Sequence, residues 1–153
     1  MGSKIWTALV LVAGCATAPP ASTVTLTAAE MDAAQFALRR DDPAQALALS
    51  ERALHLAPND PWALYERATA LAELGRTDEA VLAFSRVEAL YGDAHPRGKG
   101  LAMYGRARAL AMAGRCDEAR GAYDAYAAFE RAFDPTAAEM ATEYATGARR
   151  SSS

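Results

Sequence analysis

Two histidines and two cysteines are the side chains of this 153-residue sequence best suited to bind a metal ion or act as a nucleophile. His55 and His95 lie forty residues apart, and neither has a further ligand or nucleophile at the spacing of a known motif. Cys116 has no CxxC partner, and we expect it to be a small buried apolar side chain. The sequence therefore predicts no enzyme activity, no metal site and no cofactor.

Cys15 stands in a different context, because it closely follows the nine-residue apolar run IWTALVLVA. That run is too short to span a bilayer, which needs about 20 residues, but with Lys4 before it the segment is typical of a secretory signal. The sequence LVAGC, ending at Cys15, resembles the bacterial lipobox, in which the cysteine is acylated and becomes the new N-terminus. The resemblance implies a lipoprotein signal peptide at residues 1–14 and a lipid anchor on Cys15.

The residues after Cys15 refine this hypothesis. Ala16 resembles the sorting signal for the outer membrane of Gram-negative bacteria, which implies a lipid-anchored protein of the cell envelope that faces the periplasm. The segment ATAPPAS, residues 16–22, predicts a flexible tether within residues 15–26. The alternatives are an ordinary buried cysteine in an apolar N-terminal helix and a wrongly assigned start at Met1.

The charge of the chain excludes one class of partner. Sixteen Lys and Arg against nineteen Asp and Glu give a formal charge of −3, and Lys4 and Lys99 are the only lysines. No basic stripe suited to nucleic acid is present, so we expect no nucleic-acid partner, and no small-molecule substrate is expected either. Alanine is abundant and β-branched residues are sparse after Thr27, which favours helices over strands.

A six-residue sequence occurs twice, as GRTDEA at residues 75–80 and as GRCDEA at residues 114–119. The segments before them also correspond, YERATALAEL with YGRARALAMA. Alanine pairs twelve residues apart mark three copies: Ala34 with Ala46, Ala68 with Ala80, and Ala107 with Ala119. The step between the copies is 34 and then 39 residues, a period typical of solenoid proteins.

Each copy is predicted to be two helices joined by a tight turn. In the second copy, Asp60 and a proline at the first helical position open a helix that runs to residue 74, and Gly75 supplies the left-handed residue that ends it. Gly114 takes the same place in the third copy, whose helices are expected at about 100–113 and 117–131. Thr77 is expected to cap the second helix, which should end near residue 91.

The first copy carries helix-start signals of its own. The capping box TAAE places a helix start at Thr27, and Asp42 with Pro43 opens a second helix that should end near Pro58. At the other end of the chain, TAAEM of residues 27–31 recurs at residues 136–140. This recurrence predicts a capping helix over 135–149 that covers the last apolar face, followed by a disordered tail at 151–153.

This pattern resembles the tetratricopeptide repeat (TPR), a family with a period of 34 residues and small residues where helices cross. The resemblance implies an all-α fold, an α-solenoid of about three TPR helical hairpins plus a C-terminal capping helix. The units are expected at residues 27–60, 61–94 and 100–133 of a domain spanning 27–150. The positions expected to pack the repeats are Ala34, Ala46, Ala68, Gly75, Ala80, Ala107, Gly114 and Ala119. The first unit departs from the pattern, because Glu30 and Ser50 occupy apolar positions.

In the family, the first helix of each hairpin lines a concave groove that accepts an extended peptide or a partner helix. By position, the groove residues here are Gln35, Arg39, Tyr65, Thr69, Tyr104 and Arg108, with Asp32, Glu73 and Met112 beside them. We expect a membrane-anchored lipoprotein that acts as an adaptor or assembly factor by binding another envelope protein in this groove. The alternative is a self-associating structural or accessory subunit of an envelope complex. The GDAHPRGKG segment, residues 92–100, is predicted to be an insertion between units, or else a contact loop for a partner.

Overall fold

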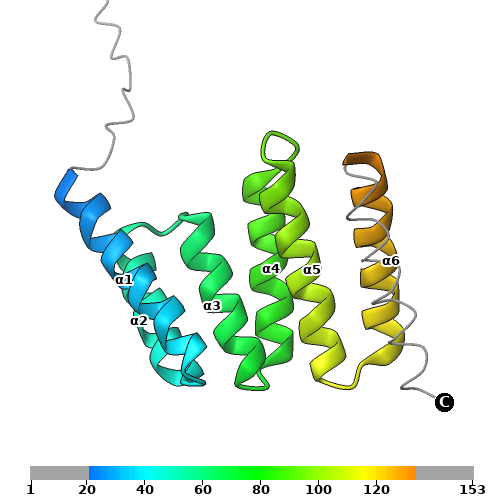
Figure 1. Cartoon of the computed structure of the whole chain (residues 1–153), viewed down its shortest axis with the longest axis horizontal. Helices are drawn as coiled ribbons and strands as arrows, with labels where there is room; N and C mark the ends of the chain where they lie inside the picture. The colour runs from blue at the N-terminus through cyan, green and yellow to red at the C-terminus, as the bar shows by residue number, and fades with distance from the viewer. Residues whose placement is uncertain (1–20, 134–153) are drawn as a thin grey trace, which may run out of the picture.

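The computed structural model describes residues 21–133 of the chain. Within this range the regular elements are six α-helices, which follow one another in a row from α1 at one end to α6 at the other (Figure 1). The helices are α1 (Ala21–Arg39), α2 (Pro43–Leu56), α3 (Pro61–Glu73), α4 (Thr77–Tyr91), α5 (Pro96–Met112) and α6 (Cys116–Phe133). The predicted all-α fold is confirmed. Residues 1–20, with Cys15, and the predicted capping helix and tail lie outside the described residues.

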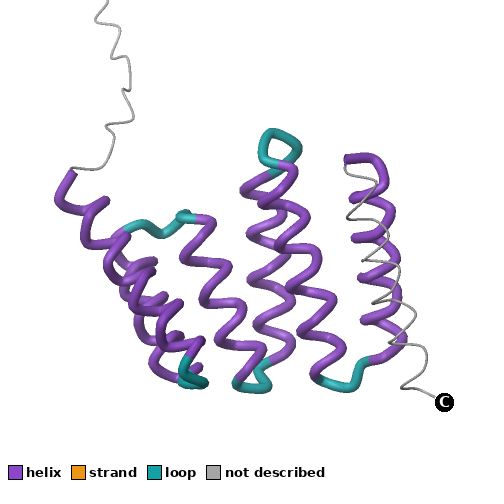
Figure 2. Tube along the Cα trace, in the orientation of Figure 1, coloured by secondary structure: helices purple, strands orange, loops and turns teal. Residues whose placement is uncertain are grey.

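The helices form three consecutive hairpins. The turns inside the hairpins lie at one edge of the row, and the connections between hairpins lie at the other (Figure 2). Each helix packs on the next one along the chain. At the crossings the helices approach closely because small side chains separate them. The six alanines predicted at these crossings have no exposed surface: Ala34, Ala46, Ala68, Ala80, Ala107 and Ala119.

Aspartate followed by proline begins two of the helices. Asp42 Oδ1 accepts a hydrogen bond from the Gln45 backbone N–H at 3.0 Å, and Asp60 Oδ1 accepts one from the Ala63 N–H at 2.7 Å. These bonds satisfy N–H groups that have no partner inside the helix. Thr77, predicted as the cap of α4, is instead its first helical residue. Arg76 holds the cap position without a side-chain cap bond.

Helix α1 begins at Ala21, six residues before the predicted start at Thr27. The prediction of a tether through residue 26 is therefore wrong for residues 21–26, and the capping box is not used as a helix start. No proline or glycine interrupts the chain between Pro20 and Arg39, so nothing stops the helix from extending backward. Thr27 lies buried within the helix.

The predicted insertion at residues 92–100 is also shorter than expected, because α5 begins at Pro96. Two of its glycines, Gly98 and Gly100, allow close packing inside the helix. A Cβ atom at Gly98 would come within 2.7 Å of the Tyr91 ring, and one at Gly100 would collide with a carboxylate oxygen of Glu130. Only residues 92–95 connect α4 to α5.

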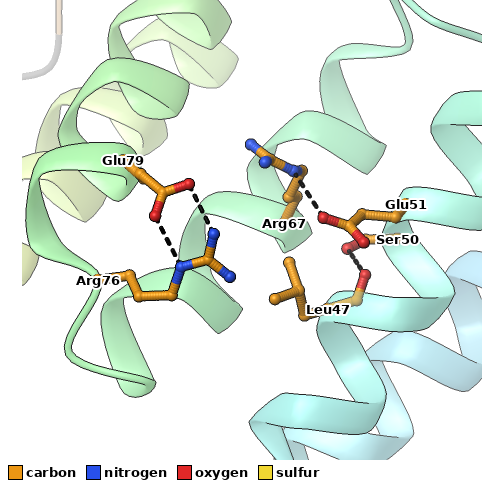
Figure 3. A network of polar contacts seen from close by, with 6 residues as sticks. All are labelled: Leu47, Ser50, Glu51, Arg67, Arg76 and Glu79. Atoms are coloured by element: carbon orange, nitrogen blue, oxygen red, sulfur yellow. Dashed lines mark hydrogen bonds and ion pairs between the residues drawn. The ribbon is translucent and has the colours of Figure 1, made fainter.

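The polar residues at apolar positions of the first unit have partners. Ser50 is fully buried and its hydroxyl donates to the Leu47 carbonyl oxygen at 2.9 Å (Figure 3). Glu30 forms an ion pair with Arg52 at 2.5 Å. Cys116, expected to be buried, is half-buried at the start of α6 and carries a free thiol.

Candidate protein-binding surface

The first helices of the three hairpins lie side by side. Helix α3 contacts both α1 and α5, whereas the second helices α2, α4 and α6 make no comparable contact with one another in the described part of the chain. The closer spacing of α1, α3 and α5 places them on the inner side of the row. We call the surface formed by Gln35, Arg39, Tyr65, Thr69, Tyr104 and Arg108 the first-helix face.

A buried carboxylate links the α1 and α3 parts of this face. Glu66 of α3 is only 4% exposed, and burial raises the pKa of its carboxyl group. A side-chain hydrogen bond with Gln35 and the positive charge of Arg39 act in the opposite direction on that pKa. Two of the predicted groove residues therefore meet at Glu66, with Gln35 half-buried and Arg39 exposed.

The α3 and α5 parts of the face meet through Arg108. Its Nη2 atom lies 2.6 Å from Glu73 Oε1, and its charge lowers the pKa of the Tyr65 hydroxyl, which burial and the nearby Glu66 raise more strongly. Thr69 Oγ1 donates to the Tyr65 carbonyl oxygen at 3.0 Å. The structure thus brings Tyr65, Thr69 and Arg108 together across two hairpins.

The two tyrosines of the face also belong to the packing between helices. The Tyr65 ring stacks on Trp62 and meets the edge of Phe84, each at 5.5 Å between centroids. Tyr104 packs against Tyr123 and Tyr126 of α6 at 6.1 and 5.7 Å. Both Tyr65 and Tyr104 are half-buried, so each presents one side to solvent and one to the core.

Sequence reasoning missed three residues of this region. Trp62 and Leu101, each exposed by a little over a third, hold the same position in the second and third units, 39 residues apart. The repeat register could have identified them. Glu66 had no such signal, because the residue 39 positions later is Gly105.

The opposite side of the array is hollowed along α3 and α4, but the charged groups that line the hollow have partners nearby. The hollow is lined by Leu64, Arg67, Glu79, Leu82, Ala83 and Arg86. Arg67 lies 3.5 Å from Glu51, and both oxygens of Glu79 accept hydrogen bonds from Arg76 at 2.7 Å (Figure 3). Arg86 donates to the Asn59 side chain at 2.7 Å. Each charged side chain of the lining thus binds a neighbouring residue, so this hollow is a weaker candidate than the first-helix face.

Residues suited to metal binding are not gathered in the described part of the chain. No group of three or more His, Cys, Asp or Glu there could hold a metal ion. His55 is exposed on α2, and His95 is exposed just before α5. None of the helices between residues 21 and 133 is both long and apolar enough to cross a membrane.

Comparisons with known proteins agree with the repeat pattern. Two family models described as tetratricopeptide repeat match residues 37–102 and 100–125, which together cover more than half of the chain. A solved TPR-like protein from Chlorobium tepidum TLS is similar in structure, with a TM-score of 0.64 and 21% sequence identity. The similarity covers 86% of this chain and 96% of that one. No curated protein matches the sequence.

Proposed function

The chain belongs to the tetratricopeptide repeat family, and we propose that it is a non-enzymatic adaptor or assembly factor that binds another protein through its first-helix face. TPR domains generally act by binding protein partners. The lipobox-like LVAGC sequence supports a lipid anchor on Cys15. In this proposal the anchor holds the domain at a membrane of the bacterial cell envelope, and Ala16 favours the periplasmic side of the outer membrane.

The observation that carries the protein-binding role is the composition of the first-helix face. Three hairpins contribute to one surface, on which Arg39 and Arg108 are exposed and Tyr65 and Tyr104 are held by packing. Tyrosine and arginine are the residues that most often dominate binding energy at protein interfaces. Rings already fixed by their neighbours lose little conformational entropy when a partner binds.

Charge reversal at two exposed arginines tests the face. The double variant Arg39→Glu with Arg108→Glu should lose protein crosslinks that the wild-type chain forms in native envelope membranes, as measured by mass spectrometry. The matched control is Arg86→Glu with Arg120→Glu, which makes the same charge change on the second helices α4 and α6. If the first-helix variant retains every crosslink, this face is not the binding surface.

The anchor is tested separately. The N-terminal peptide of the mature protein should begin at Cys15 and carry the mass of attached acyl chains. The variant Cys15→Ser should leave the membrane fraction. An unmodified cysteine that remains in the mature chain would contradict the lipoprotein assignment and leave the protein-binding proposal standing.

A further inference from the structure

Helix α1 carries an apolar stripe on its exposed side, and the stripe begins at Leu26, which borders a hollow shared with α2. Leu26, Ala29, Ala33 and Phe36 are all exposed, Leu26 by 57% and Phe36 by 53% of their surface. Their spacing of three, four and three residues places them along one side of the helix. The opposite side of α1 packs on α2 and α3. An end of a solenoid normally has a polar outer face, so we expect this apolar stripe to be covered by another surface.

Two arginines stand at one end of the stripe. The guanidinium groups of Arg39 and Arg40 lie 6.0 and 5.6 Å from the centre of the Phe36 ring. Neither guanidinium belongs to a salt bridge among residues 21–133, although Asp32 and Asp41 are exposed on the same helix and at its end. Arg39 also acts on the Glu66 carboxyl group of α3, so Arg40 is the guanidinium free to face away from the array. An aromatic ring beside such a guanidinium group is suited to the boundary between acyl chains and phosphate headgroups.

The distance along the chain from Cys15 limits where this face can lie. Helix α1 begins at Ala21, so only five residues separate it from Cys15. Even fully extended, that segment spans at most about 20 Å at 3.3–3.6 Å per residue. The 19 residues of α1 extend about 28 Å at 1.5 Å per residue. A helix that starts this close to a lipid anchor can reach the membrane along its whole stripe.

We propose that the α1 stripe lies on a phospholipid surface, with Leu26 and Phe36 at the acyl boundary and Arg40 at the phosphates. This inference rests on the proposed lipid anchor at Cys15. The lipid chain supplies the affinity, and the stripe sets the orientation of the domain. Helix α6, at the other end of the row, then points away from the membrane (Figure 1).

Position-specific fluorescence tests the orientation in the full-length lipidated protein. In a Cys116→Ser background, Ala33→Cys is labelled with an environment-sensitive dye, while the acylated Cys15 does not react. The matched control is Ala89→Cys, an exposed alanine on α4. Both proteins are reconstituted into vesicles of phosphatidylethanolamine and phosphatidylglycerol with or without brominated acyl chains. We expect brominated lipid to quench the label at position 33 and to leave the label at position 89 unchanged.

A second pair of variants separates the stripe from the anchor. Leu26→Ser with Phe36→Ser should abolish the quenching at position 33, whereas Leu82→Ser with Leu90→Ser, two exposed leucines on α4, should preserve it. Absent quenching at position 33, or equal quenching at both positions, would overturn the proposal. A blue shift at position 33 that grows with protein density and resists brominated lipid would overturn it in favour of a second copy of the chain.

The mass of the N-terminal peptide, measured on the same samples, distinguishes the two proposals. A lipid on Cys15 without quenching at position 33 refutes the orientation alone. An unlipidated Cys15 refutes the anchor and the orientation together.

Discussion

The turns inside the three hairpins have the same backbone geometry with different residues. In the second and third hairpins, Gly75 and Gly114 adopt φ angles of 74° and 72°. In the first hairpin, Asp41 takes this left-handed position with φ 61°. In each turn the next N–H donates to a carbonyl five residues back: Arg76 to Leu71, Arg115 to Leu110 and Asp42 to Ala37, at 2.9–3.0 Å. The way the helices pack therefore fixes the turn, and glycine only makes it easier to form.

The helix crossings do not differ in this way. Each hairpin has a fully buried alanine from each of its helices where they cross. Aspartate tolerates a left-handed backbone better than most residues do, but no larger side chain can replace a methyl group between two helices in contact. The comparison between the first hairpin and the later two thus shows that a buried alanine is needed at every crossing, whereas glycine is not needed in every turn.

The largest expected effect tests the strict requirement. Ala46→Leu, Ala80→Leu and Ala119→Leu should each lower the free energy of unfolding by about 1–3 kcal/mol, because the added carbons overpack the crossing. Urea unfolding followed by circular dichroism measures the change. The exposed Ala89→Leu serves as the control and should change stability by less than about 0.5 kcal/mol. A harmless Ala46→Leu would show that the first hairpin does not cross as the others do.

The turn glycines should give the next largest effect. Gly75→Val and Gly114→Val should each cost about 1–2 kcal/mol, since a β-branched residue is strained in the left-handed region. A Cβ atom at either position would meet no other atom within 4 Å, so the loss would reflect backbone strain and not a clash. Unchanged unfolding midpoints in both variants would contradict the role assigned to these turns.

The sequence was sufficient to predict the features that depend on local chemistry or on the repeat register. Aspartate followed by proline marked the starts of α2 and α3, and the two GRxDEA copies marked the turns from α3 to α4 and from α5 to α6. The register also located Tyr65 and Arg108, which the structure brings together across two hairpins.

Features that depend on contacts between distant segments could not be predicted in this way. Gly98 and Gly100 suggest a loop, yet both lie inside α5. There the Tyr91 ring and the Glu130 side chain approach from other helices and leave no room for a larger residue. Asp41 gave no sign of its left-handed backbone, since only the surrounding hairpin imposes it. Glu66 is defined by Gln35 and Arg39 of a different hairpin.

A smaller effect of opposite sign is expected at the first turn. Asp41→Gly should raise the free energy of unfolding by about 0.5 kcal/mol, because relief of the left-handed strain exceeds the added entropy of the unfolded chain. Asp41→Ala should give no such gain, since its Cβ atom keeps the strain. Thermal unfolding of the two variants beside the wild type measures the difference. A loss of stability in Asp41→Gly would mean that the Asp41 side chain itself stabilises the turn.

The junctions between hairpins also differ, because one of them holds a buried carboxyl group, and this makes its stability depend on pH. Glu66 lies between α3 and α1, whereas at the corresponding position of α5 Gly105 makes room for the Phe84 ring of α4. Because burial raises the pKa of folded Glu66, its protonated form contributes stability below the unfolded value of 4.5, and that stability is lost as pH rises through the folded pKa.

The difference in unfolding free energy between wild type and Glu66→Gln should therefore shift in favour of the wild type as the pH falls from 7 toward 4.5. Subtracting the variant is necessary, because Glu79 and Glu118 are bound to arginines that lower the pKa of each carboxyl group and have the opposite pH dependence. A difference that stays constant over this range would contradict the raised pKa of Glu66.

The smallest effect concerns the ion pairs that join neighbouring turns. Arg115 binds Glu118 within its own turn and also reaches Asp78 of the preceding turn, with Nη1 2.6 Å from Asp78 Oδ1. Arg76 binds Glu79 in the same way, but the residue 34 positions before Asp78 is Ala44, so Nη1 of Arg76 has no such carboxylate in the described region.

Ala44→Asp should supply that carboxylate and raise the melting temperature slightly at low salt. An aspartate in the first turn of α2 also favours the helix by itself, so the variant must be compared with Ala44→Asp in an Arg76→Gln background. Only a coupling between the two positions, lost at high salt as exposed charges are screened, indicates a new contact between turns. Equal gains with and without Arg76 would mean that the aspartate acts on its own helix, and that the link between turns belongs to the second and third hairpins.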